Sequence, residues 1–509
     1  MLIVVILIVT VISLFRLGYP TYLGDEMETV IYSKTISMMN HWMPSTLMQD
    51  NNLITYGSLG DSSRSYHPAM QSWLQYYIPR IVFMFIPNAT PFATRLPFVL
   101  IGIIGLIFTY KTILKITKKN EAVWATLIIG LSGFFLPLIR CLRYYSLTYF
   151  FSSYFYYYFI DAIITPEKKF STSKKIHIFI ALCGVYFSHY LNFYILALSS
   201  IIYILIFRRN THKYLLIPFF LSIFVSLVDF TINHLDFILL KFSNLNIDKL
   251  HIISIIDFKI FFLLIPLLFV KSINKTIYGS HFQKYYIIAF SVNYFLLLML
   301  KVSDIKYYIW ISIPFFLLIV LIWNAHLKRL LFILLISIIF FISYLYPSHA
   351  LGIFLSQLNN TQDNHKFTNK IVELVTPNSK VMMLGFLGPY FYANTNHKFN
   401  YVGQIPARLK GFYSNYDSHL FDDFHSIDYI VGGYEDVFNL KVETNEKYLD
   451  SPIFFEYYGK RYQRIYLETW VKKYPFYHLV YRKIKYKITH NNKLKENYNI
   501  EASFIYKRI

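Results

Sequence analysis

The chain has 509 residues, of which 55% are hydrophobic, 20% aromatic and only 15% charged, and its mean hydropathy is +0.41. Ordinary soluble domains carry about 25% charged residues, so this composition excludes a disordered chain, a collagen-like fibre and a simple soluble enzyme. Both cysteines, Cys141 and Cys183, lie in apolar runs, which excludes a disulfide scaffold and a cysteine zinc site. The sequence therefore predicts a polytopic α-helical membrane protein.

The formal net charge is +21, which in a soluble protein would suggest a nucleic-acid partner. Here the basic residues cluster in short loops between apolar runs, as the positive-inside rule expects of a membrane protein. The chain has no nucleic-acid-binding motif. We therefore expect membrane lipids, and no nucleic acid, among its partners.

Eleven apolar runs are candidates to cross about 30 Å of hydrocarbon. They lie near 1–18, 92–110, 122–140, 144–164, 176–194, 195–207, 214–233, 258–270, 285–300, 309–325 and 330–347. The loops between them alternate in charge, with sixteen basic residues in one set and seven in the other. The richer set is predicted to be cytoplasmic, which places the segment 19–91 and the tail from 348 outside. The first run has no basic stretch before it and no small-residue cleavage site, so we expect it to be a retained anchor.

Two regions outside the predicted spans have a composition of their own. The segment 19–91 carries tryptophans, tyrosines and prolines among apolar residues, and predicts helices on the membrane surface around 26–40 and 68–86. The tail returns to a soluble composition, and its runs Lys380–Gly385 and Ile427–Gly432 are β-like and end in glycine. We therefore predict a membrane module over 1–347 and a small extracytoplasmic α/β domain over 348–509.

Acidic residues follow the first span directly, in the sequence Gly24-Asp25-Glu26. A partly desolvated carboxylate at the membrane surface is more basic than usual and suits the removal of a proton from a hydroxyl. The same acids would also serve at a helix N-terminus, and both roles stay open. In Tyr66-His67-Pro68 the proline marks a helix start, where His67 either faces an anion or is an ordinary interfacial histidine.

Further polar clusters are predicted to emerge on the same side as Asp25. Arg140 and Arg143, followed by Tyr144, are spaced to lie on one helical face, where they either bind a phosphate or anchor the membrane edge. The other clusters are His189-Tyr190 and Lys306-Tyr307. Arg95 is expected to reach toward lipid headgroups. Cations, a carboxylate and aromatic rings at one outer pocket fit a reaction in which a lipid phosphate leaves, because cations stabilise its developing charge.

These motifs occur in an order that resembles a known family. The chain resembles membrane glycosyltransferases of the GT-C fold, specifically the family 39-like group of protein O-mannosyltransferases and aminoarabinose transferases. The resemblance covers about residues 1–330, through Gly24-Asp25-Glu26, Tyr66-His67-Pro68-Ala69, Ala93-Thr94-Arg95-Leu96-Pro97, Arg140-Cys-Leu-Arg143-Tyr144-Tyr145, Phe187-Ser188-His189-Tyr190 and Lys306-Tyr307-Tyr308. Ala69 departs from it, since a second proline is usual at that position.

The resemblance implies inverting transfer of a sugar from a polyprenyl-phosphate donor to an acceptor hydroxyl on an envelope lipid, glycan or protein. The reaction would take place at the extracytoplasmic face of a bacterial inner membrane. Asp25 matches the catalytic acid, with Glu26 in support and Asp50 and Asp61 as alternative carboxylates. The residues implied for the donor phosphate and sugar are His67, Arg143, Tyr144, His189, Tyr190, Lys306 and Tyr307. Some members of this fold use a divalent metal and others use none, so both alternatives stay open.

Three other functions remain as alternatives. A transporter or flippase of lipid-linked sugars should place ionisable residues near the middle of its spans, and Asp161 and Asp229 are the candidates. A polymerase or ligase of lipid-linked glycans also works at the outer face, but lacks the early Asp-Glu and His-Pro motifs. A structural subunit with a decayed site would have lost Asp25, Arg143 and His189, which are all present.

Overall fold

The structure is a computed structural model, in which two parts of the chain form separate compact units. It describes residues 1–18, 22, 26, 29–30, 33, 74–132, 135–164, 170–208, 213–233, 265–275, 279–299, 310–324, 365–376, 379–383, 400–403, 428–433, 454–457, 460–473 and 498–509. One unit comprises 1–19 and 69–360, and the other 20–68 and 361–509. The first unit is helical and the second contains a β-sheet.

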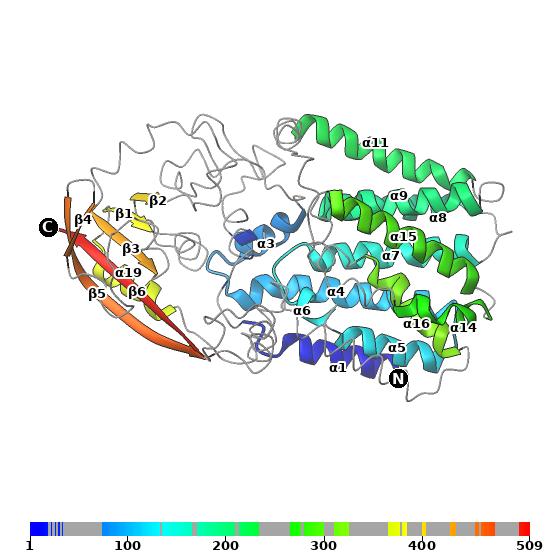
Figure 1. Ribbon diagram of the computed structural model, residues 1–509, viewed down its shortest axis with the longest axis horizontal. Coiled ribbons are helices and arrows are strands. Elements are labelled where there is room, and N and C mark those ends of the chain that lie inside the picture. The colour runs from blue at the N-terminus through cyan, green and yellow to red at the C-terminus, as the bar shows by residue number, and fades with distance from the viewer. Residues whose placement is uncertain are drawn as a thin grey trace, which may run out of the picture. The chain divides into compact units, whose positions relative to one another are not determined.

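The described part of the helical unit consists of helices that range from one turn to more than six turns. Its elements are α1 (Leu2–Leu14), α3 (Leu74–Phe85), α4 (Pro91–Leu114), α5 (Lys119–Leu131), α6 (Leu136–Ile139), α7 (Tyr145–Ile164), α8 (Thr172–Ser188), α9 (Tyr190–Phe207), η1 (Lys213–Leu215), α11 (Leu216–Asn233), η4 (Ile265–Phe269), α14 (Val270–Asn274), α15 (Gly279–Met299) and α16 (Ser312–Asn324). The axes of α4, α7, α8, α9, α11 and α15 run in similar directions (Figure 1).

Local signals explain where several of these helices begin. The Thr90 hydroxyl accepts a hydrogen bond from the Ala93 N–H at 3.3 Å, and Pro91 is the first residue of α4. The Ser171 hydroxyl accepts from the Lys174 N–H, also at 3.3 Å, at the start of α8. Both side chains satisfy N–H groups that have no partner within the helix, so each stabilises its helix start.

Small residues bring the central helices close together. A Cβ atom on Gly105 of α4 would lie 2.9 Å from Cα of Phe150 on α7, and one on Gly184 of α8 would lie 2.1 Å from the Phe151 ring. Such distances are too short for a side chain, so each glycine allows its helix to approach a neighbour.

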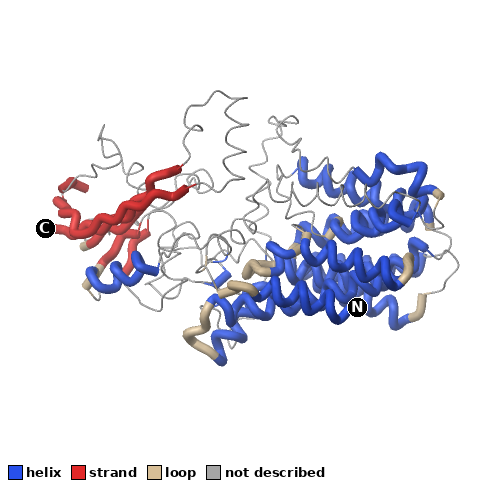
Figure 2. Tube along the Cα trace, turned by 90° about the horizontal axis from the view of Figure 1, so that it is seen from below, coloured by secondary structure: helices blue, strands red, loops and turns tan. Residues whose placement is uncertain are grey.

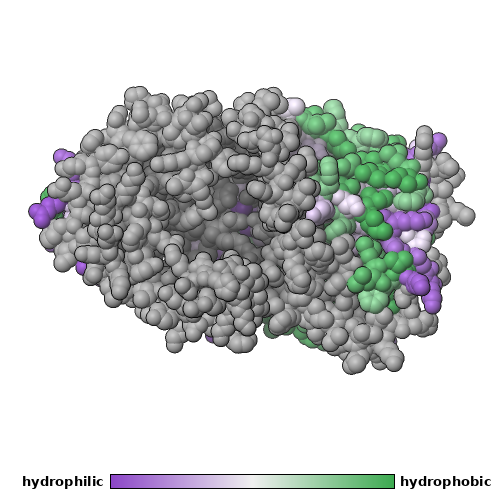
Figure 3. Space-filling model, viewed as in Figure 1, coloured by the Kyte–Doolittle hydropathy of each residue, from purple (hydrophilic) through white to green (hydrophobic). Residues whose placement is uncertain are grey.

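Large apolar side chains point outward from the same helices. Exposed examples are Ile3 and Leu7 on α1, Ile104 on α4, and Phe220 and Phe224 on α11. On the face seen in Figure 3, hydrophobic residues form a broad band over the helices, and hydrophilic residues lie at the end near α14. A helical surface of this kind suits a hydrocarbon environment.

The described helices test the predicted spans in part. Two helices, α4 and α9, are long and apolar enough to cross a membrane, while α1 and residues 312–322 of α16 are shorter apolar helices. The number of eleven spans therefore stays a prediction, and the run 330–347 lies outside the described residues. One predicted span, 122–140, is wrong, because the helix ends at Leu131 and a short separate helix follows at Leu136. The boundary predicted at 194/195 is also wrong, since α8 and α9 meet at His189.

The second unit contains a mixed six-stranded sheet with one helix against it (Figure 2). The strands are β1 (Lys380–Met383), β2 (Asn400–Gly403), β3 (Tyr429–Gly433), β4 (Phe454–Tyr457), β5 (Lys460–Lys473) and β6 (Tyr498–Arg508), in the order β2-β1-β3-β6-β5-β4. The pairs β1–β2 and β1–β3 are parallel, and the remaining pairs are antiparallel. The two runs predicted as strands form β1 and β3.

A small apolar core joins the helix α19 (His365–Leu374) to this sheet. Ile371 in the helix and Val375 just after it are buried together with Val381 of β1, Val431 of β3 and Ile505 of β6. Successive side chains of a strand point to opposite faces of the sheet. Val381, Val431 and Ile505 belong to the apolar face that packs against the helix. Burial of that face stabilises the sheet.

Candidate active site

The helical unit has two ends of different chemistry, and we name them by their residues. The basic end is formed by the C-terminal ends of α4, α7 and α9 and the N-terminal ends of α5, α8 and α15. Side-chain bonds join these helix ends, from Lys115 to Asp161 at 3.1 Å and from the Arg208 guanidinium to the Ile163 carbonyl at 2.8 Å. Its described basic residues are Lys111, Lys115, Lys118, Lys119, Lys174, Lys175, Arg208, Lys213, Lys271, Lys275 and Lys284.

The opposite end, which we call the arginine end, is where α1 and α8 finish and where α4, α7 and α9 start. It contains Arg95, Arg140 and Arg143, whose side chains are at most 1% exposed. A fully buried guanidinium is costly unless it is hydrogen-bonded or paired. The partners of these three arginines therefore indicate what each one does.

Arg140 and Arg95 bind the end of α1. The Arg140 Nη1 and Nη2 atoms donate to the carbonyls of Ile12 and Phe15, each at 2.7 Å, and the Arg95 Nη1 atom donates to the Leu17 carbonyl at 2.9 Å. The last carbonyls of a helix have no partner within it and carry partial negative charge, so cations stabilise them. The expectation that Arg95 reaches toward headgroups is wrong, because its side chain is completely buried. Arg140 and Arg95 thus stabilise the end of α1 and the residues that follow it.

Arg143 lies beside an aromatic cluster at the start of α7. Its Cζ atom is 5.8 Å from the centre of the Tyr144 ring. The Tyr144 ring is 4.2 Å from the His189 ring and 4.6 Å from the Tyr145 ring, measured between centres. The Tyr144 N–H donates to the Gln75 side chain of α3 at 3.0 Å. Four elements thus position one arginine, one histidine and two tyrosines at the same place.

His189 is positioned by the break between α8 and α9. Its backbone is extended, and it is both the C-cap of α8 and the N-cap of α9. Its Nδ1 atom accepts the Asn192 N–H at 3.3 Å, and a bond of 3.1 Å from Thr148 to Ser188 ties the preceding residue to α7. Because Nδ1 accepts, the neutral imidazole carries its proton on Nε2 and is a hydrogen-bond donor there.

The other predicted site residues divide into two groups. Tyr190 follows His189, but its ring packs against Tyr186, 4.9 Å away between centres, and Tyr186 in turn donates to Asp229 at 2.7 Å. Glu26 belongs to the unit with the sheet, where it is completely buried. The remaining candidates lie outside the described residues: Asp25, His67, Lys306 and Tyr307, together with Asp50 and Asp61.

Sequence reasoning missed several residues of this end. Gln75 and Asn192 carry no motif, and each is completely buried. Neither side-chain polar atom of Asn192 has a hydrogen-bond partner within the part of the chain that the structure describes. A polar residue one turn after the His189 cap was the available signal. Among the described residues, no three histidine, cysteine or acidic side chains come together as metal ligands.

Comparisons with known proteins show a shared fold. No family profile and no curated protein matches the sequence. A crystal structure of ArnT from Cupriavidus metallidurans bound to undecaprenyl phosphate has a TM-score of 0.57 at 11% identity, covering 87% of this chain and 94% of that one. Its apo state gives 0.53 at 11% identity, covering 87% and 95%. The archaeal oligosaccharyltransferase AglB from Archaeoglobus fulgidus, in complex with an inhibitory peptide and a dolichol-phosphate, gives 0.47 at 12%, covering 85% and 69%.

The likeness to ArnT shows that this chain has the fold of a helical membrane protein of the GT-C type. The resemblance read from the sequence motifs is therefore confirmed at the level of fold.

Proposed function

We propose that the protein is an inverting membrane glycosyltransferase, which moves a sugar from a polyprenyl-phosphate donor to an acceptor hydroxyl. The observation that carries this proposal is the buried cluster of Arg143, Tyr144 and His189 at one end of a fold shared with an undecaprenyl-phosphate-bound protein. A buried cation with donors and aromatic rings around it suits a lipid-linked phosphate and its sugar.

The distribution of charge supports an outward-facing site. Eleven described basic residues lie at the basic end, where only Asp161 and Glu121 are acidic among the described residues. The positive-inside rule predicts that this end is cytoplasmic. The arginine end and the sheet domain would then be extracytoplasmic, and the membrane would be a bacterial inner membrane.

The proposed reaction is a single displacement at the anomeric carbon. The acceptor oxygen forms a bond to this carbon while the bond from carbon to the donor phosphate oxygen breaks, which inverts the configuration. The acceptor proton passes to the Asp25 carboxylate, with Glu26 in support. Arg143 stabilises the negative charge that develops on the departing polyprenyl phosphate. Because its side chain is already buried, it needs little reorganisation to do so.

The other predicted residues complete the donor site in this proposal. The Nε2–H of His189 donates to a phosphate or sugar oxygen, and Tyr144 stacks on the sugar ring. His67, Tyr190, Lys306 and Tyr307 are proposed to contact the donor as well. The acceptor is an envelope lipid, glycan or protein, and the transferred sugar is a hexose or a pentose.

The transporter alternative was suggested by Asp161 and Asp229, and the positions of these two aspartates argue against it. Asp161 lies in the last turn of α7 and Asp229 in the last five residues of α11. Asp161 pairs with two lysines, and Asp229 accepts from Tyr186. Neither aspartate lies at the middle of its helix, where a transport site would be expected.

The test is an assay in nanodiscs with labelled polyprenyl-phosphate sugars and a crude envelope extract as acceptor. We expect wild type to release polyprenyl phosphate and transfer label, and Asp25→Asn to lower the rate at least ~10²-fold, as loss of a general base does. Asp50→Asn and Asp61→Asn test the alternative carboxylates, and a chelator arm tests the metal. Equal rates for wild type and Asp25→Asn would disprove the base. Absence of transfer, together with movement of labelled lipid across sealed vesicles, would establish a transporter.

A further inference from the structure

We propose that the basic end binds the headgroup of an anionic phospholipid, at the place where α4, α7 and α8 meet around Asp161. This inference does not depend on the proposed transferase activity. It concerns lysines at the end opposite the candidate active site.

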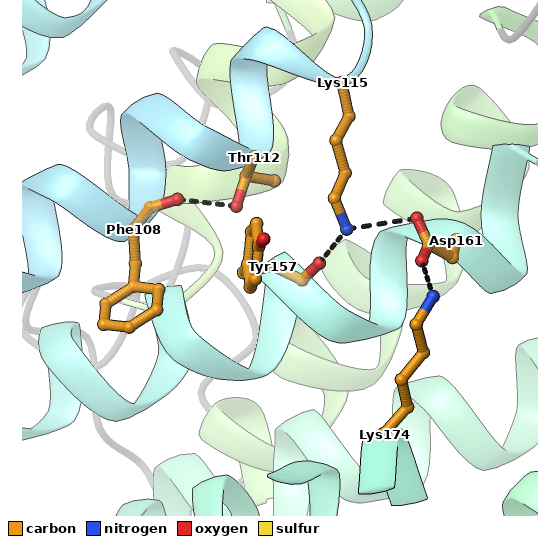
Figure 4. Close-up of polar contacts among 6 residues, drawn as sticks. All are labelled: Phe108, Thr112, Lys115, Tyr157, Asp161 and Lys174. Carbon is orange, nitrogen blue, oxygen red and sulfur yellow. Dashed lines mark hydrogen bonds and ion pairs between the residues drawn. The ribbon is translucent and has the colours of Figure 1, made fainter. Parts of the chain in front are cut away.

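Two lysines share one carboxylate at this place (Figure 4). The Lys115 Nζ atom is 3.1 Å from one oxygen of Asp161, and the Lys174 Nζ atom is 2.5 Å from the other. Lys115 also donates to the Tyr157 carbonyl at 2.5 Å. The side chain of Asp161 is 7% exposed, whereas those of the lysines are 25% and 28% exposed. The carboxylate is therefore inside the cluster and the ammonium groups are at its surface.

The cluster carries more positive than negative charge. Two lysines and one aspartate leave an excess of one, and the exposed Lys111, one turn before Lys115 on α4, raises it to two. An anion at this surface would be attracted by these lysines.

The surroundings favour a lipid over a soluble anion. The Lys115 Nζ atom is 4.2 Å from the centre of the Tyr157 ring, and the Lys111 Nζ atom is 5.5 Å from the Phe108 ring. The two rings are 5.8 Å apart between centres. On α4, Ile104 and Leu114 are 46% and 41% exposed. Cations beside aromatic rings and exposed aliphatic side chains match a phosphate with acyl chains attached, because such rings favour the membrane interface.

The experiment titrates detergent-solubilised full-length protein with short-chain phosphatidylglycerol and follows the unfolding temperature. Phosphatidylcholine of the same chain length is the charge control, and glycerol 3-phosphate is the soluble-anion control. We expect phosphatidylglycerol alone to raise the unfolding temperature in a saturable way. Lys174→Gln should raise the midpoint concentration about five-fold, the effect of one lysine near a lipid surface. Lys271→Gln, at the same end on α14, should change it less than two-fold.

Asp161→Asn should change the midpoint concentration in the opposite direction to Lys174→Gln. Removal of the competing carboxylate should lower the midpoint for phosphatidylglycerol, although the ion pairs are lost. A purely structural ion-pair cluster would instead destabilise the protein and leave the midpoint unchanged. If Asp161→Asn does not fold, the two lysine variants distinguish lipid binding from a purely structural ion-pair cluster. Equal responses to both lipids, equal shifts in the two lysine variants, or equal affinity for glycerol 3-phosphate would each overturn the proposal.

Discussion

The two ends of the helical unit use cations in different ways. At the arginine end, Arg95, Arg140 and Arg143 are buried, and two of them donate to backbone carbonyls of the first helix and the residues after it. At the basic end, lysines predominate and are at least partly exposed. The exception is Arg208, which is 8% exposed and donates to the carbonyls of Ala162 and Ile163 at the end of α7.

The difference follows from the chemistry of the two side chains. A guanidinium is planar, is weakly hydrated and donates in several directions at once, so it can bind several carbonyls when buried. An ammonium is strongly hydrated and reaches toward water or headgroups from a long apolar stem. Buried arginine is therefore suited to helix ends whose carbonyls must be hydrogen-bonded inside the protein. Lysine is suited to the membrane interface. Arg143 lies beside the Tyr144 ring in the aromatic cluster, which is why we assign it to the ligand.

The largest expected effect tests that assignment. Arg143→Gln should lower the transfer rate about 10²- to 10³-fold, as loss of a preorganised group that stabilises developing charge does. Arg143→Lys should recover only part of the rate, because one ammonium does not reproduce the guanidinium geometry. The measurement is the initial rate at saturating donor in nanodiscs. A rate within three-fold of wild type for Arg143→Gln would show that this arginine is structural.

The next effect concerns stability. Arg140→Met removes two hydrogen bonds from a charged group to buried carbonyls and should lower the free energy of unfolding by about 3 kcal/mol. The rate per folded molecule should change less than three-fold, because Arg140 is committed to α1. Reversible unfolding in mixed detergent measures the first quantity, and Arg208→Met at the basic end is the matched control. A loss of rate without loss of stability would contradict this division of roles.

A smaller effect is expected at the aromatic cluster. Tyr144→Ala removes the ring that packs on His189 and should lower the transfer rate about five-fold, because an aromatic pair contributes about 1 kcal/mol beyond its buried area. Tyr144→Phe keeps the ring and should retain most of the rate. Comparison of the two variants separates stacking from the hydroxyl group. Equal loss in both would assign the role to the hydroxyl instead.

The smallest effect belongs to an exposed lysine. Lys284 of α15 lies with its Nζ atom 5.0 Å from the centre of the Phe207 ring. Lys284→Gln should reduce the free energy of unfolding by less than about 1 kcal/mol, which is typical of an exposed cation–π contact. Thermal unfolding in nanodiscs can measure this change beside Arg208→Met. A loss as large as that of the buried arginine would contradict the contrast between the two side chains.

Local patterns predicted a helical membrane fold and the positions of several described helices. Apolar runs and charged loops are local properties, so they can be recognised without knowing the contacts. The break after Leu131 was missed because its flanking residues are as apolar as a continuous span. The helix boundary at His189 was misplaced because the apolar run continues across it into α9.

The roles of the buried arginines could not be predicted from local patterns. Arg140 binds carbonyls 125 and 128 positions earlier in the chain, and every residue has a carbonyl, so no side-chain signature marks these partners. Sequence spacing therefore suggested that Arg140 and Arg143 act as a pair, whereas the tertiary structure separates them. The strand β6 was missed for a related reason, since its polar and charged residues hide an alternation that only its neighbours β3 and β5 make meaningful.

The position of β6 has a consequence for biosynthesis. It is the last of the six strands to be made, yet it lies in the middle of the sheet, between β3 and β5. Before residues 498–508 leave the ribosome, the sheet consists of two halves, β2-β1-β3 and β5-β4, each with an unpaired edge. Exposed edges of this kind are prone to pair with other chains. The domain therefore cannot close strand by strand during translation, and chaperones that bind extended segments should associate with it until β6 is inserted.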